Sequence, residues 1–272
     1  MLIRLALKLS EFSPRFKRLL WRRWYQYLAG YQMAEWRFMN YGYASLNASE
    51  DPLILPPEDE PDRYAIQLYH RVAGAVELKG REVLEVGCGR GGGASFIRRR
   101  HRPRHMTCVD FSDKAVRFCR EQHRLDGLSF VHGDAEALPF GEESFDAVVN
   151  VESSHCYGSM PAFLSEVCRV LRPGGHFLFA DFRPVENCDR LHQQLVETRM
   201  AILEQQDITP HVLEALRQDS DRRFALIDRS INKRLVDTFR QFAAVEGSEV
   251  FDGFKNGAAI YLRYVLQKQK IV

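Results

Sequence analysis

The stretch VLEVGCGRGGGASF, from Val83 to Phe96, constrains the fold of this chain more than any other part of the sequence. Its first four residues, three of them apolar, predict a buried parallel strand. Five glycines follow within Gly87–Gly93, and a helical pattern resumes after them. Glycine lets the backbone lie against a ligand, and the N–H groups that begin the next helix point above the strand end. The unit therefore predicts a nucleotide-like ligand at the tip of this strand.

Further strands and helices alternate after this unit. The expected strands cover residues 106–110, 128–132, 145–151 and 176–181, with helices between them. Such alternation predicts an α/β fold with a doubly wound, mostly parallel sheet. Ligands of these sheets bind outside the carboxyl ends of the strands, so the candidate site is expected at that edge.

The remaining segments predict helical additions to the sheet. Residues 185–242 have a helical periodicity, and strand-like alternation returns only at 258–266. We therefore expect a helical cap insertion at about 184–242, between the fifth and sixth strands and above the ligand crevice. Residues 1–60 are predicted to form an N-terminal helical extension or lid, and residues 61–272 the cofactor-binding domain.

The N-terminal helices are expected to carry a basic face rich in aromatic residues. Its residues are Arg15, Lys17, Arg18, Arg22 and Arg23, interleaved with Trp21, Trp24 and Tyr25. This composition favours a helix packed on its own domain with a solvated basic face, and it also fits peripheral contact with anionic lipid. A lid, a dimer contact and a membrane anchor are the alternatives, and the sequence does not fix the oligomeric state.

Composition argues against several other classes of protein. Lys and Arg number 38 against 36 for Asp and Glu, a net charge of +2, so no nucleic-acid partner is expected. No apolar run reaches the roughly 18 residues that span a membrane. The six cysteines show no C-x-x-C spacing, and no cluster of His, Asp and Glu has metal-ligand spacing. We therefore expect no metal and a cytoplasmic location, where thiols stay reduced.

Acidic residues at the predicted strand ends narrow the choice of ligand. Glu85 precedes the glycine turn, where a carboxylate would repel a pyrophosphate and attract an ammonium group. Asp110 lies about 20 residues past the first glycine, which suits a ribose diol and by itself fits NAD as well. Asp134 follows another strand and can accept a hydrogen bond from the amine of adenine. S-adenosylmethionine, with adenine, ribose and a cationic amino-acid tail but no phosphate, fits these positions.

At these residues the sequence resembles class I S-adenosylmethionine-dependent methyltransferases. The shared motifs are E-x-G-x-G-x-G at 85–91, Asp110, Gly-Asp-Ala at 133–135 and Leu-Arg-Pro-Gly-Gly at 171–175. A closer resemblance is to mycobacterial phthiotriol/phenolphthiotriol dimycocerosate methyltransferases and polyketide O-methyltransferases. The residues that carry it are 40–43, 68–71, 91–95, 150–152 and 154–157. The resemblance implies a Rossmann-like fold with a seven-stranded sheet, and S-adenosylmethionine as the cofactor.

The resemblance also implies roles for single residues. Glu85, Gly87 and Gly89 would hold the methionine end of the cofactor. Asp110 would hold the ribose, and Asp134 with Ala135 the adenine. The other candidates for cofactor binding are Cys88, Phe111 and Asn150. The candidates for acceptor binding are Tyr41, Tyr43 and Tyr157.

Methyl transfer requires that donor and acceptor be aligned and that the acceptor lose its proton. Alignment supplies roughly 7–11 kcal/mol, and a general base about 10²–10⁴-fold in rate. By resemblance to natural-product sugar methyltransferases with a Glu-Ser-x-His segment, His155 is the expected base and Asp181 its partner. Packing without chemistry is the alternative for a lone histidine.

The expected function is O-methylation of a hydroxyl or carboxyl group on a hydrophobic small molecule, such as a polyketide or lipid. Two alternatives stand beside it. One is C-methylation of the sterol or quinone type, which uses the same cofactor site. The other is binding of S-adenosylmethionine without catalysis.

Overall fold

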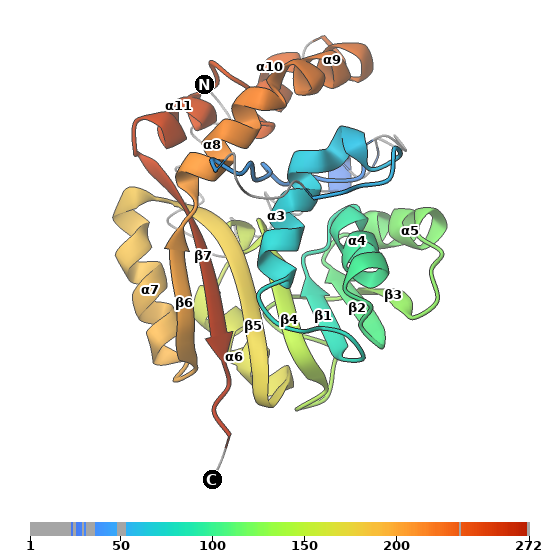
Figure 1. The fold of residues 1–272 in the computed structure, drawn as a ribbon, viewed down its shortest axis with the longest axis vertical. Coiled ribbons are helices and arrows are strands. Elements are labelled where there is room, and N and C mark those ends of the chain that lie inside the picture. Colours follow the sequence, from blue (N-terminus) through green and yellow to red (C-terminus); the bar gives the residue numbers. More distant parts are fainter. Residues whose placement is uncertain are drawn as a thin grey trace.

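The computed structural model describes residues 23, 26–28, 30, 36–47, 53–233 and 235–270. The strands are β1 (Glu82–Val86), β2 (His105–Asp110), β3 (Leu128–His132), β4 (Phe145–Val151), β5 (Leu171–Pro184), β6 (Ala201–Asp207) and β7 (Ala259–Gln267). They form one sheet in the order β3-β2-β1-β4-β5-β7-β6 (Figure 1). β1 to β5 are parallel, whereas β7 runs antiparallel to both of its neighbours. The predicted α/β class and mostly parallel seven-stranded sheet are confirmed.

Helices cover both faces of the sheet. The α-helices are α3 (Arg63–Ala73), α4 (Gly92–Arg100), α5 (Asp113–Gln122), α6 (Met160–Val170), α7 (Cys188–Glu197), α8 (Thr209–Gln218), α9 (Ser220–Ser230), α10 (Val236–Phe242) and α11 (Glu249–Lys255). The 3-10 helices are η1 (Glu60–Asp62), η2 (Ser154–Cys156) and η3 (Val185–Asn187). α3, α4 and α5 bury their apolar sides in the core on one face, and α6 and α7 in the core on the other.

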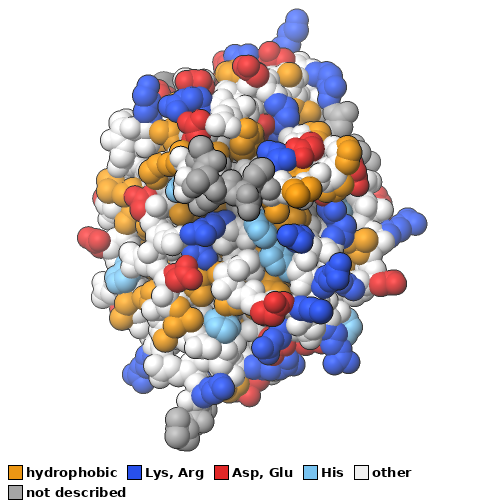
Figure 2. Space-filling view, viewed as in Figure 1, with side chains coloured by type: hydrophobic (Ala, Val, Ile, Leu, Met, Phe, Trp, Pro, Cys, Tyr) orange, Lys and Arg blue, Asp and Glu red, His pale blue; other side chains and the backbone are white. Residues whose placement is uncertain are grey.

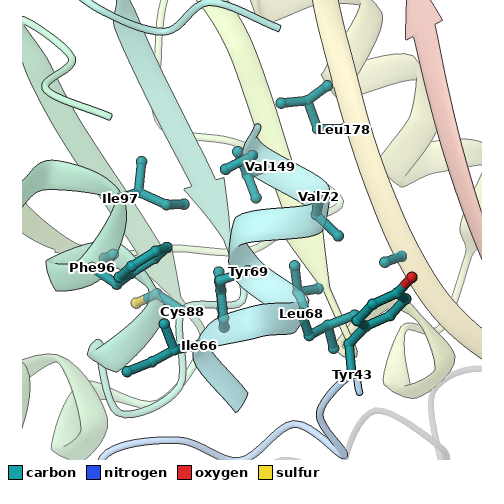
Figure 3. Packing of buried hydrophobic residues seen from close by; sticks show 14 of the residues in the cluster. Tyr43, Ile66, Leu68, Tyr69, Val72, Cys88, Phe96, Ile97, Val149 and Leu178 are labelled. Atoms are coloured by element: carbon teal, nitrogen blue, oxygen red, sulfur yellow. The ribbon is translucent and has the colours of Figure 1, made fainter. Parts of the chain in front are cut away.

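α3 shows how the apolar pattern of the sequence produces this packing. Its apolar residues recur three or four positions apart, so they share one side of the helix. Ile66, Leu68, Tyr69 and Val72 are all buried, and Val149 belongs to the same cluster (Figure 3). Burial of such a side chain stabilises the fold by about 1.5–3 kcal/mol.

The helical region expected at 184–242 contains a strand, so that expectation is corrected. β6 (Ala201–Asp207) lies inside it and pairs with β7. The helical insertion, α8 to α11, therefore lies between β6 and β7, and the strand expected as the sixth is the seventh. The sequence AILEQQD is rich in good helix formers, and its strand conformation depends on pairing with β7 at the sheet edge.

α8 to α11 lie above the edge of the sheet at which the parallel strands end (Figure 1). The helices expected over the first 35 residues lie mostly outside the described residues, and so does most of their basic face. No helix in the described part of the chain is both long and apolar enough to cross a membrane.

The surface carries both signs of charge. Figure 2 shows basic, acidic and apolar side chains mixed over one face, with basic ones frequent on the side where α4 and α5 lie. Two arginines at the end of α4 have partners elsewhere in the chain: Arg98 donates to the Asp126 carbonyl, and Arg99 pairs with Asp59 at 2.8 Å. Part of the arginine run thus joins neighbouring segments of the fold.

Candidate functional site

A pocket opens above the carboxyl ends of β1, β2 and β4, where the sequence places the ligand. Its empty volume is about 1200 Å³ including the open mouth. Three parts of the chain line it: the glycine turn, the loops after the strands, and residues 37–41, which together with Trp36 we call the 36–41 segment. The predicted residues along the wall are Gly87, Cys88, Gly89, Asp110, Phe111, Asp134, Ala135, His155, Tyr41 and Tyr157.

The glycine turn has a backbone shape that other residues disfavour. Gly87 and Gly89 have φ angles of +78° and +53°, in the left-handed region. A Cβ on Gly87 would lie 2.2 Å from Ser153 Oγ, so a side chain there would collide with the loop after β4. The turn therefore leaves its backbone as the surface that a ligand meets.

Glu85 lies beneath this turn and is fully buried. Its Oε1 accepts a hydrogen bond from the Tyr69 hydroxyl at 2.7 Å, while Oε2 has no partner in the described part of the chain. Burial raises the pKa of Glu85 to about 7, against the lowering effect of the Tyr69 hydrogen bond. A buried carboxylate oxygen that lacks a donor fits the ammonium group of a methionine-like ligand.

Asp110 ends β2 and fixes the other side of the turn. Its carboxylate accepts the Gly89 N–H at 2.8 Å and the Ser112 N–H at 2.9 Å, one on each oxygen. Burial raises the pKa of Asp110, and these two hydrogen bonds oppose that rise. Each oxygen keeps a lone pair for a ribose hydroxyl. Asp134, which accepts the Glu136 N–H at 3.0 Å, lies with Ala135 and Phe111 along the same wall.

The start of α4, which binds phosphate in many nucleotide sites, is occupied here by the chain itself. The Gly92 N–H donates to the Arg37 carbonyl at 3.2 Å. The Arg37 side chain is fixed in turn by Asp59 at 3.0 Å and Asp62 at 2.9 Å. A carbonyl in this position disfavours an anion, so the pocket suits a nucleoside ligand without a pyrophosphate.

Glu85 and three further predicted residues lie off the pocket wall. Asn150 is buried beneath it, where its Nδ2 lies 2.8 Å from both the Val86 carbonyl and Ser153 Oγ. Tyr43 stacks on His211 with ring centroids 4.4 Å apart, and α3 lies between it and Cys88 in Figure 3. Asp181, buried behind the wall, reaches the pocket through His155.

His155 and Asp181 form a hydrogen-bonded pair beside the pocket. Nδ1 of His155 lies 2.8 Å from Oδ1 of Asp181, whose Oδ2 accepts the His155 backbone N–H at 2.9 Å. Burial lowers the pKa of His155, but Cys156 and Asp181 outweigh it and the net pKa is raised above 6.5. Burial also raises the pKa of Asp181, and the charges of His155 and Arg183 bring it below its usual 3.8. The pair can bind a proton at an imidazole with a fixed orientation.

Glu152 lines the pocket and was not among the predicted site residues. Its Oε1 accepts the Tyr41 N–H at 2.6 Å and the Tyr261 hydroxyl at 2.9 Å. Burial raises its pKa to about 8, against the lowering effect of these hydrogen bonds. Its φ of +47° is uncommon for a glutamate, and such backbone often marks functional sites. The Glu-Ser-x-His pattern was the signal in the sequence that could have pointed to it.

Comparison with known proteins identifies the family of the chain. Residues 84–179 match the methyltransferase domain family. The chain is 40% identical over 260 residues to a phthiotriol/phenolphthiotriol dimycocerosates methyltransferase of Mycobacterium leprae, covering 94% of each chain. It is 39% identical over 234 residues to a fatty-acid O-methyltransferase of Mycolicibacterium smegmatis, covering 85% of this chain and 83% of the relative.

A solved structure shows the same fold. It is the geranyl diphosphate C-methyltransferase from Streptomyces coelicolor, solved with Mg²⁺, geranyl diphosphate and S-adenosyl-L-homocysteine. Its TM-score is 0.61 at 18% identity, over 90% of this chain and 97% of that one. Given the 40% identity over nearly the whole length described above, the chain belongs to the family of S-adenosylmethionine-dependent methyltransferases that includes the phthiotriol/phenolphthiotriol dimycocerosates methyltransferases.

Proposed function

We propose that this enzyme transfers a methyl group to an oxygen atom, a hydroxyl on a hydrophobic, lipid-like acceptor. The observation that carries the proposal is the His155–Asp181 pair. His155 lines the pocket, and its Nδ1 lies 2.8 Å from Oδ1 of Asp181. When bound, S-adenosylmethionine supplies an activated methyl group. An aliphatic hydroxyl must still lose its proton, and Nε2 of His155 is the nitrogen that takes it.

The surroundings of His155 suit an apolar acceptor. The Phe182 ring lies 4.5 Å from the His155 ring and 5.3 Å from the Tyr41 ring, measured between centroids. Phe182, Tyr41 and Phe242 all line the pocket. The names of the two relatives point the same way, since one acts on phthiotriol-type dimycocerosates and the other on fatty acids.

A carboxyl group is the second candidate acceptor, since the chain is 39% identical to a fatty-acid O-methyltransferase. A carboxylate has already lost its proton at neutral pH and needs no base. The His155–Asp181 pair would then have no proton to remove, so the geometry favours the hydroxyl.

The experiment is product analysis with S-adenosylmethionine that carries a ¹³C-labelled methyl group. The purified protein is incubated with decan-2-ol and, separately, with decanoic acid, and the carbon spectrum distinguishes O-methyl from C-methyl products. We expect an ether from the alcohol. A label on carbon would contradict the proposal in favour of C-methylation, and a methyl ester as the only product would favour the carboxyl acceptor.

A further inference from the structure

Arg183 lies next to the His155–Asp181 pair, near the end of β5, and its side chain is only 12% exposed. Its Nη1 lies 3.1 Å from Oδ2 of Asp181 and donates to the Phe182 carbonyl at 2.7 Å. Its Nη2 donates to Ser154 Oγ at 2.6 Å, and that hydroxyl donates in turn to Asp181 Oδ2 at 2.6 Å. Arg183 is not among the residues that line the pocket, so these contacts direct its charge at Asp181.

Asp181 is thus a fully buried carboxylate shared by two basic side chains. His155 Nδ1 lies 2.8 Å from Oδ1, and the guanidinium of Arg183 lies on the side of Oδ2. Arginine keeps its positive charge in proteins, so Asp181 and Arg183 together are already neutral. A proton on His155 therefore adds a second positive charge around one carboxylate, in a buried setting where like charges disfavour each other.

The other titratable groups that face this pair come from three parts of the chain. They lie in the loop after β4, in the 36–41 segment and in β7, and they are Glu152 and Cys156, Tyr41, and Tyr261. Each of them is neutral or negative, so none opposes a positive charge on His155. Arg223, which donates to the Tyr41 carbonyl, is paired with Asp219 at 2.8 Å. Among these groups, Arg183 is therefore the one whose charge opposes protonation of His155.

We propose that Arg183 is a positioning residue for methyl transfer: by balancing the charge of Asp181, it makes His155 give up its proton at a lower pH than Asp181 alone would allow. Asp181 orients the ring and stabilises the imidazolium. Arg183 limits that stabilisation, so the ring returns to the neutral form that accepts the next proton. This inference rests on the proposed function, because it concerns the base assigned there.

The test follows the His155 ring directly and does not depend on turnover. The histidines are labelled with ¹³C at Cε1, and NMR records the pH titration of the His155 signal, which is assigned by its loss in His155→Ala. Arg183→Gln removes the positive charge but keeps an amide that can donate to Ser154 Oγ. We expect the His155 titration in Arg183→Gln to move to higher pH by about one unit. The rising limb of the kcat profile with decan-2-ol should move with it.

A purely structural role of Arg183 predicts the opposite sign. If Arg183 only held Asp181 in place, its loss would loosen the pair, and the titration would move to lower pH, as expected for Asp181→Asn. A shift to lower pH, or no shift, would overturn the inference. Arg183→Lys keeps the charge without the guanidinium fork and should titrate close to the wild type. A shift in Arg183→Lys as large as that in Arg183→Gln would overturn the inference too.

The matched control is Arg190→Gln, which removes the same charge at an exposed position on α7 and should leave the titration unchanged. An equal shift in this control would attribute the effect to net charge and overturn the inference. If Arg183→Gln does not fold, because Asp181 is left buried without its cation, the double variant Arg183→Gln/Asp181→Asn replaces it. His155 should titrate at higher pH there than in Asp181→Asn, and equal titrations would overturn the inference. A His155→Ala enzyme with near wild-type kcat contradicts only the proposed function, since the titration does not depend on turnover.

Discussion

His155 and Asp181 are joined twice, through the imidazole Nδ1 at 2.8 Å and through the backbone N–H at 2.9 Å. The carboxylate therefore sets both the position of the backbone and the orientation of the ring. Ser154 Oγ, at 2.6 Å, and the Phe182 N–H, at 2.9 Å, also donate to Asp181, which limits its movement. Asp181 therefore holds one ring nitrogen of His155, Nδ1, in a fixed position.

Replacement of His155 by alanine should lower kcat by about 10²–10⁴-fold, because the acceptor proton then has no base. The affinity for S-adenosylhomocysteine should change little, since the cofactor residues lie elsewhere on the wall. His105 lies at the start of β2, whereas the pocket is at the end of that strand, so His105→Ala is the matched control and should keep the wild-type kcat. A His155→Ala enzyme with near wild-type kcat would show that alignment alone drives the reaction.

The pH profile tests the link to Asp181. The base must be neutral, and the pKa of His155 is raised above 6.5, so kcat should rise with pH through an apparent pKa above that value. In Asp181→Asn the carboxylate charge is lost and the imidazolium is less stabilised. The rising limb should then move to lower pH while the maximum rate falls. If the rising limb of the Asp181→Asn profile stays at the wild-type pH, the pH dependence does not arise from the His155–Asp181 pair.

Replacement of Asp110 should weaken S-adenosylhomocysteine binding by at least about tenfold, because hydrogen bonds to a charged acceptor contribute about 1.5–3 kcal/mol each. Asp110→Ala also leaves the Gly89 and Ser112 N–H groups without an acceptor, so it should lower the melting temperature. Asp110→Asn keeps an oxygen and should separate the two effects, with weaker binding at nearly unchanged stability. Asp126→Ala, an exposed change, serves as the control in calorimetry.

Two helical glycines offer a test of the packing around the turn. A Cβ on Gly93 would lie 1.9 Å from Cζ of Tyr69, whereas one on Gly253 would have its nearest neighbour at 3.8 Å. Gly93→Ala should destabilise the protein by about 1–3 kcal/mol through overpacking and displace the hydroxyl that bonds Glu85. Gly253→Ala should be neutral or stabilising by up to about 1 kcal/mol. Urea denaturation measures both, and similar values for the two variants would contradict this packing.

His101 should make stability depend on pH. Burial lowers its pKa from 6.5 to about 4, with further lowering by His70 and Arg100, so the folded protein keeps this ring neutral. Above pH 6.5 the His101 ring is neutral in both the folded and the unfolded protein, so it does not reduce the free energy of unfolding. As the pH falls towards 4, the unfolded chain binds a proton at His101 more readily than the folded protein does, and the free energy of unfolding decreases. His101→Gln should flatten the loss of stability between these values. Melting curves across this range check the prediction.

Much of the fold could be predicted from the sequence because its central strands are apolar runs bounded by turn residues. β3 (Leu128–His132) and β4 (Phe145–Val151) have the expected bounds. β6 could not be predicted, since its polar residues favour a helix locally and only pairing with β7 makes them a strand. Edge strands of this kind carry little apolar signal of their own.

The candidate site, too, could be predicted only in part from the sequence. The acids after the parallel strands could be placed together because these strands end at one edge of the sheet. The location of Tyr43 could not be predicted, because it lies in a loop whose contact with His211 joins residues far apart in the chain. Glu152 depends on a backbone φ that its sequence does not reveal.

The 36–41 segment has a consequence for the order of events in catalysis. Its Arg37 carbonyl is bonded to the start of α4, after the glycine turn, and its Tyr41 N–H is bonded to Glu152, which follows β4. Arg223 of α9 holds the Tyr41 carbonyl at 3.1 Å, so the segment is fixed from above as well. One continuous piece of chain thus walls both halves of the pocket. We expect the spent cofactor to leave only when this wall opens, which also releases the methylated product, so that the two exits are kinetically linked.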